Sequence, residues 1–390
     1  MTVSDLQSSP GAPGAASDDA PTTATAAGNA SSAAATGGRS FLPRSTLLRH
    51  LLVLALCSVG AVLLLEGTER STNDQISRIA FYAIAAGGLT LLTGLNGQIS
   101  LGHGALMAVG AYTTALLLDV DGDPLPLPLI FLIAVAITAV VGAVVGVAAA
   151  RLHGPYLAGA TLALAVAVPG LTLYFSGTLG GEQGINVRAP QAPDWFVDAI
   201  DAISGERGQG TKWLAYIAVA CLLITYFLLA NLMRSRIGRT WRAVRDQEVA
   251  AELAGISLGS WRVLAFVVSA AAAGLAGGVL AIVVRLTAPG SFLPVLSLSL
   301  LTAIVIGGLG SLFGALLGSV LLVLLPQWSR DFGLDVLGMG SAQAAEAAFV
   351  IYGLLLVLTM LFAPAGLVGT VRLALLKRRA ARAMAAAGRR

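Results

Sequence analysis

The sequence LTGLNGQISLGHG at Leu92–Gly104 decides how this chain folds. Its four glycines stand among the polar residues Asn96, Gln98, Ser100 and His103. Polar side chains at membrane depth are costly unless they face protein or a water-filled path. Glycines let a helix break there, so that backbone groups line a cavity. The stretch therefore predicts a broken helix beside a substrate pathway, and the alternative is a tight cytoplasmic turn with close helix packing.

The rest of the chain has the composition of a membrane protein. Of its 390 residues, 56% are hydrophobic and 11% are charged, whereas a soluble domain carries about a quarter charged residues. A spanning helix needs about 20 mostly apolar residues, so Leu47 to Phe362 has room for roughly eight to ten. We expect an all-α polytopic membrane protein with glycine-rich broken helices. Nucleic-acid binding is not needed to explain a net charge of +4.

The distribution of charge predicts the topology. Basic residues flank the first apolar run, fill the loop 233–262 and recur in the tail 371–390, so both termini and this loop are expected in the cytoplasm. The acidic loop 176–212 is then external. Residues 1–44 have few large apolar groups and are expected to be a disordered tail. The transmembrane domain is expected to cover residues 45–370.

A second glycine-rich stretch, IGGLGSLFGAL at Ile306–Leu316, resembles the first. In both, the pair SL is followed closely by GAL, as it is between Ser100 and Leu106. The likeness indicates a weak internal duplication with paired broken segments. The alternative is chance in a chain rich in Gly, Ala and Leu.

The basic loop contains a third segment, GRTWRAVRDQEVAAELAGI at Gly238–Ile256. Asp246 can cap the start of a short helix and Gly255 can end it. Val249 and Leu253 are four residues apart and share one face of that helix. Because the loop is far longer than a turn requires, we expect a helix that docks a partner; a solvated interfacial helix is the alternative.

The sequence also argues against several kinds of chemistry. Neither of the two lysines, Lys212 and Lys377, follows a glycine, which excludes a Walker A phosphate loop. Any ATP that the protein uses must then be bound by another chain. No HExxH motif or Cys/His metal spacing occurs. We therefore expect no catalytic residues, no metal, no cofactor and no enzymatic activity.

Several blocks together resemble one family, the branched-chain amino acid ABC importer permeases, and most closely its LivM-like subunit. Thr93–Tyr112 resembles the family's signature, and Gly238–Ile256 resembles its coupling segment. Ala303–Pro326 is similar to its third, glycine-rich block, and Thr178–Ile185 to its external loop. The resemblance covers roughly residues 45–370. The related urea and short-amide permeases share much of this pattern.

The resemblance implies a permease subunit in the cell (inner) membrane of a prokaryote. Its partners would be a second homologous permease chain, two cytoplasmic ABC ATPase subunits and an extracytoplasmic substrate-binding protein. The cargo would be branched-chain amino acids; the alternatives are a urea or short-amide importer, or an ATP-independent channel. ATPase-coupling roles transfer to Arg239, Arg242, Arg245, Asp246, Glu248, Ala251 and Gly255. Substrate-pathway roles transfer to Asn96, Gln98, Ser100, His103, Gly308 and Ser311.

Overall fold

The computed structural model describes residues 46–119, 125–152, 154–194, 196–198 and 210–335, together with single residues and short stretches between 343 and 376. Across these residues the fold is helical apart from one pair of two-residue strands. The expected tail 1–44 and nearly all of the tail 371–390 lie outside the described residues.

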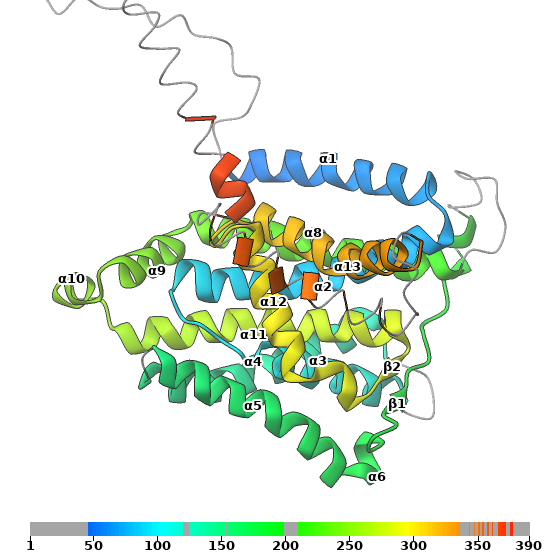
Figure 1. The fold of residues 1–390 in the computed structure, drawn as a ribbon, viewed down its shortest axis with the longest axis horizontal. Helices are drawn as coiled ribbons and strands as arrows, with labels where there is room; N and C mark the ends of the chain where they lie inside the picture. The colour runs from blue at the N-terminus through cyan, green and yellow to red at the C-terminus, as the bar shows by residue number, and fades with distance from the viewer. Residues whose placement is uncertain are drawn as a thin grey trace, which may run out of the picture. The chain divides into compact units, whose positions relative to one another are not determined.

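The apolar runs of the sequence form the helices of a bundle (Figure 1). In chain order these are α1 Thr46–Glu66, α2 Arg70–Leu89, the π-helix η1 Thr90–Leu95, α3 His103–Leu118, α4 Leu127–Ala150, α5 Pro155–Tyr174, α6 Ser176–Leu179, α8 Gly210–Arg234, α9 Arg236–Asp246, α10 Glu248–Leu253, α11 Leu258–Val284, the 3-10 helix η2 Pro289–Phe292, α12 Pro294–Gly307 and α13 Leu312–Asp335.

Six helices among the described residues are long and apolar enough to cross a membrane, namely Arg70–Leu95, Leu127–Ala150, Pro155–Tyr174, Lys212–Arg234, Leu258–Val284 and Pro289–Gly307. Three shorter apolar helices accompany them, at His50–Glu66, His103–Leu118 and Leu312–Trp328. The expected helical, multi-span class is therefore confirmed. The count of about eight to ten spans and the side on which the termini lie stay predictions.

α11 lies at the centre of the bundle because small residues let its neighbours approach closely. A Cβ atom added to Gly142 of α4 would lie 2.2 Å from the Cβ of Ala270. One added to Gly110 of α3 would lie 2.1 Å from the carbonyl oxygen of Gly274. Backbone approach of this kind drives helix association in membranes, where no hydrophobic force acts between helices.

The two long loops lie at opposite ends of α11. α9 and α10 precede this helix, whereas β2 (Leu286–Thr287) follows it and pairs antiparallel with β1 (Ile185–Asn186). Figure 1 shows α9 and α10 at the left and the two strands at the right. The 27 residues of α11 are about 40 Å long, enough to cross the hydrocarbon core. We call the end with α9 and α10 the basic end; its location in the cytoplasm stays a prediction.

Candidate transport pathway and coupling segment

The first glycine-rich stretch is a break between two helices, while a substrate pathway beside it stays a prediction. α2 widens into the π-helix η1, after which the Gln98 N–H donates to the Leu92 carbonyl over 3.2 Å. π-helical turns are rare in proteins, and many of those that occur lie at functional sites. The chain then runs without helical structure from Asn96 to Gly102, and α3 begins at His103. We call Asn96–Gly102 the first break.

The first break returns from the basic end into the middle of the bundle. His103 Nε2 lies 2.9 Å from the carbonyl oxygen of Ala85. Ala85 lies about 15 Å along the helix axis from Leu95, the last residue of η1, which stands at the basic end. α3 therefore starts at mid-depth, and its 16 residues are too few to span a bilayer alone.

Four polar side chains are buried along this path: Asn96, Gln98, Ser100 and His103. Asn96 Nδ2 donates to Gln98 Oε1 over 2.8 Å, and the Thr93 hydroxyl donates to the Gln98 carbonyl over 3.0 Å. Asn96 Oδ1, Gln98 Nε2 and His103 Nδ1 have no hydrogen-bond partner among the described residues. Buried polar groups are normally paired. The network can therefore accept further partners, such as water or a polar solute.

Two hydroxyl groups that the sequence did not single out hold the first break in place. Thr161 of α5 accepts a hydrogen bond from the Leu101 N–H over 2.9 Å. Ser297 of α12 accepts one from the Gly104 N–H, also over 2.9 Å. The only signal in each case was a hydroxyl residue in an apolar helix that contains other hydroxyl residues. The break is thus tied to α5 and α12 as well as to α2.

The second glycine-rich stretch is also a break, between α12 and α13, but it is built differently. Gly308 has a φ of 120°, a conformation that favours glycine. The Ser311 hydroxyl accepts a hydrogen bond from the Gly314 N–H over 3.1 Å and so caps α13. We call Gly308–Ser311 the second break. A pathway role for Gly308 and Ser311 stays a prediction.

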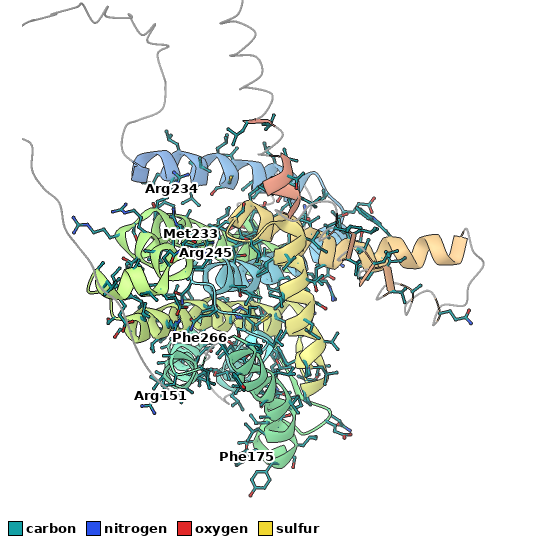
Figure 2. The ribbon with its side chains drawn as sticks, turned by 60° about the vertical axis from the view of Figure 1, so that its left-hand side comes forward. Arg151, Phe175, Met233, Arg234, Arg245 and Phe266 are labelled. Atoms are coloured by element: carbon teal, nitrogen blue, oxygen red, sulfur yellow. The ribbon has the colours of Figure 1, made fainter. Side chains whose placement is uncertain are left out.

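The two breaks meet at the basic end through Gly94, the η1 residue two positions before the first break, which packs against Gly310 of the second break. A Cβ atom on Gly94 would lie 2.4 Å from the backbone nitrogen of Gly310, so no larger residue fits at Gly94 without movement. Arg245 of α9 reaches the same point, where its guanidinium donates to the Gly94 carbonyl. Figure 2 shows Arg245 close to Met233 and Arg234 at the end of α8. The coupling segment thus contacts the residue at which both breaks meet.

A tryptophan that the sequence analysis passed over anchors α9 to the bundle. Trp241 is fully buried, and its indole N–H donates to the Trp261 carbonyl over 3.0 Å. At the start of α9, the Ser235 hydroxyl accepts a hydrogen bond from the Ile237 N–H over 3.1 Å and so caps the helix. α9 is therefore held firmly against α8 and α11.

The predicted short helix exists as α10, but its start was predicted wrongly. Asp246 ends α9, where its carboxylate pairs with Arg245 at 2.7 Å, and Gln247 stands at the cap of α10. The predicted end is confirmed. Gly255 has a φ of 82°, and the Ile256 N–H donates to the Ala251 carbonyl over 3.1 Å. With the bond from the Gly255 N–H to the Glu252 carbonyl, this is a Schellman motif.

α10 has one fixed face and one free face. Ala251 is buried, and Glu248 forms an ion pair of 2.5 Å with the buried Arg262, a partner that the sequence did not predict. On the other face, Val249 is 71% exposed and Leu253 is 84% exposed. A helix of six residues thus presents two apolar side chains beyond the bundle while its other side is held by α11.

The remaining coupling candidates bind backbone groups. The Arg242 guanidinium donates to the Met233 carbonyl over 2.5 Å, and that of Arg239 donates to the Arg234 carbonyl over 3.4 Å. Both bonds join α9 to the last turn of α8. All seven predicted coupling residues therefore lie on or beside α9 and α10, with Ala251 facing inward.

A bundle of membrane-spanning helices with a buried polar break and an exposed helix at its basic end is the architecture of a membrane permease. The family model described as "Branched-chain amino acid transport system / permease component" matches residues 72–360. The high-affinity branched-chain amino acid transport system permease protein LivM of Escherichia coli K12 is 32% identical over 343 residues, which cover 84% of this chain and 77% of that protein.

Two further relatives carry the same kind of description. BraD of Pseudomonas aeruginosa is 28% identical, with 74% of this chain and 91% of that protein covered. LivH of Escherichia coli K12 is 25% identical, and the match covers 74% of this chain and 91% of that protein. The chain belongs to the branched-chain amino acid transport permease family, and within it is LivM-like. It is a multi-pass membrane protein of amino-acid transport.

Proposed function

We propose that this chain is the permease subunit of an ATP-binding cassette importer for branched-chain amino acids in a prokaryotic cell membrane. A second, related permease completes the channel, and an extracytoplasmic binding protein delivers the substrate. Two cytoplasmic ATPase subunits drive the permease pair between outward-open and inward-open states. The permease has no phosphate loop of its own, which suits this division of labour.

The exposed apolar face of α10 carries the proposal. Val249 and Leu253 are largely exposed on a helix that lies beyond the bundle, in a loop rich in charge. Apolar side chains on a short, firmly capped helix are suited to docking in a groove of another protein. Since the positive-inside rule assigns this end to the cytoplasm, the partner that fits is a cytoplasmic ATPase subunit.

The contacts of α9 supply a route from that partner to the pathway. Arg245 is adjacent to Asp246 at the end of α9, and its guanidinium binds the Gly94 carbonyl. Gly94 lies in η1, two residues before the first break begins at Asn96. A push on α10 is passed through α9 to η1, and the first break with its polar network changes shape in response.

The chemistry of the first break suits a small solute without net charge. Residues 96–103 contain amides, a hydroxyl and an imidazole but no carboxylate, lysine or arginine. Such groups accept and donate hydrogen bonds to a passing zwitterion without trapping it. They would treat urea in the same way, so the choice of cargo rests largely on the binding protein, and an experiment must compare the two.

The test is uptake of radiolabelled leucine by native cells whose chromosomal gene carries Leu253→Asp. We expect uptake to fall to background with normal amounts of protein in the membrane, because the charge prevents docking. Ala250→Ser, at an exposed position of the same helix, is the matched control and should transport normally. Full uptake by Leu253→Asp would overturn the coupling assignment. Uptake of urea in place of leucine by the unaltered strain would overturn the proposal that the cargo is a branched-chain amino acid.

A further inference from the structure

A basic pocket lies at the end of α8, beside the contact between Arg245 and Gly94 that the proposed coupling route uses. Its volume is about 540 Å³, and three arginines contribute to its lining: Arg234, Arg242 and Arg245. One carboxylate, that of Asp246, pairs with Arg245. The Arg234 side chain forms no hydrogen bond or ion pair with any described residue. The pocket therefore carries excess positive charge, with one guanidinium available for an anion.

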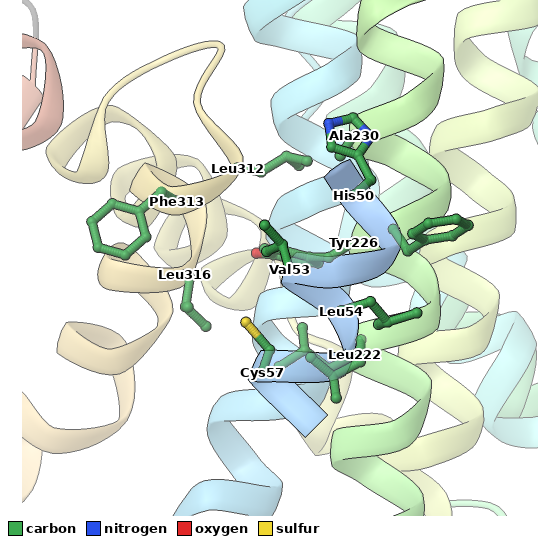
Figure 3. Close-up of a pocket in the computed structure, with 12 residues that line it drawn as sticks. His50, Val53, Leu54, Cys57, Leu222, Tyr226, Ala230, Leu312, Phe313 and Leu316 are labelled. Carbon is green, nitrogen blue, oxygen red and sulfur yellow. The ribbon is translucent and has the colours of Figure 1, made fainter. Parts of the chain in front are cut away.

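The basic pocket continues into an apolar groove along the membrane-spanning part of the bundle. The groove has a volume of about 300 Å³ and runs between α1, α8 and α13. Ala230 and Leu312 line both the pocket and the groove, so the two cavities adjoin. Figure 3 shows Val53 and Cys57 on α1 opposite Leu312, Phe313 and Leu316 on α13.

The walls of the groove face outward and are apolar. Val53 is 51% exposed and Phe313 is 61% exposed. His50, the most polar residue on the α1 side, is turned to Asn231, whose Oδ1 lies 2.6 Å from its Nδ1. A hydrocarbon chain thus meets little polar surface along the groove, whereas a charged group meets guanidinium at its basic end.

We infer that the pocket and groove together bind one anionic phospholipid of the cytoplasmic leaflet. The phosphate lies among Arg234, Arg242 and Arg245, and the first part of an acyl chain lies in the groove. Arginine presents forked donors that match phosphate oxygens, and basic pockets between helices on the cytoplasmic side recognise anionic headgroups. Arg234 ends α8, the position from which a long basic side chain reaches the headgroup layer.

The position of this lipid gives it a consequence for the rest of the molecule. Gly94 and Gly310, where the two breaks meet, also line the basic pocket. A phosphate in the pocket binds α8, α9 and both breaks at once. The lipid thus acts as a removable cross-link at the point where the coupling segment contacts the pathway.

The experiment is native mass spectrometry of the purified full chain, titrated separately with phosphatidylglycerol, phosphatidylcholine and soluble glycerol 1-phosphate. We expect one phosphatidylglycerol to bind in preference to phosphatidylcholine, and glycerol 1-phosphate to bind far more weakly. Arg234→Gln should weaken phosphatidylglycerol binding about fivefold, the effect of roughly one basic residue at a membrane surface. Ala230→Trp, at the junction of the two cavities, should abolish it.

Arg236→Gln is the matched control, since Arg236 is exposed at the start of α9 and does not line the pocket. It should bind phosphatidylglycerol as the unaltered chain does. Should Ala230→Trp fail to purify as a single species, Leu316→Trp fills the groove from α13. Equal binding of the two phospholipids, or equal binding by the Arg234 and Arg236 variants, would overturn the proposal. Equally strong binding of glycerol 1-phosphate would also overturn it, because the groove would then have no part.

Discussion

The first break and the second break have similar sequences and different constructions. Residues 96–102 include buried polar side chains, and hydroxyl groups of α5 and α12 bind the backbone of Leu101 and of Gly104, which follows the break in α3. Two of the four residues 308–311 are glycines, and the hydroxyl of Ser311 caps α13. The same short motif thus supplies a polar lining in one half of the chain and close backbone packing in the other.

The two constructions meet in close backbone packing at Gly94 and Gly310. One break can therefore move only if the other accommodates it. The guanidinium of Arg245 binds the carbonyl of Gly94 at the same place, so the proposed coupling segment contacts the point where the two breaks meet.

The largest effect is expected from Gly94→Ala. Its Cβ atom would lie 2.4 Å from the nitrogen of Gly310 and force the two breaks apart. Overpacking of backbone against backbone costs about 1–3 kcal/mol or more, so we expect leucine uptake to fall at least about tenfold. Gly159→Ala is the control, since nothing lies within 4 Å of its added Cβ. Equal uptake by the two variants would show that the breaks do not move as one.

An intermediate effect is expected from Thr161→Val, which keeps the shape of the side chain and removes the acceptor for the Leu101 N–H. A buried donor without a partner costs about 1–3 kcal/mol. We expect the midpoint of thermal unfolding in detergent to fall and leucine uptake to fall with it. Thr302→Val is the comparison, because among the described residues the Thr302 hydroxyl bonds to the Leu298 carbonyl of its own helix alone. If both variants unfold alike, the first break does not depend on α5.

The smallest effect is expected from Ser311→Ala. Loss of a helix cap costs about 1 kcal/mol, so the thermal midpoint should fall slightly while leucine uptake remains close to that of the unaltered chain. The measurements are the same as for Thr161→Val, made on the same preparations. Loss of leucine uptake with an unchanged midpoint of thermal unfolding would assign Ser311 to the pathway. The two breaks would then not differ in function.

The sequence was most informative where polar residues stand among apolar ones. Asn96, Gln98, Ser100 and His103 are conspicuous between two apolar runs, and the broken helix followed from them. The end of α10 followed in the same way from Gly255, whose φ of 82° suits glycine. In both cases the chemistry is local, so a single window of sequence contains it.

What the sequence could not provide are contacts between distant residues. Arg245 and Gly94 are 151 positions apart, and Gly104 and Ser297 are 193 apart. A lone threonine or serine in an apolar helix has the same appearance whether it bonds its own helix or another segment. The start of α10 was predicted wrongly because Asp246, although aspartate is a common helix cap, pairs with Arg245 and stays within α9.

The docking of α10 can be measured by incorporating a photoreactive phenylalanine at Leu253 in native cells, with Glu182 of the opposite loop as the control position. Ultraviolet light should join the Leu253 variant to an ATP-binding protein and leave the Glu182 variant without that adduct. A Leu253 adduct only with lipid, or with a protein of the external side, would contradict the account.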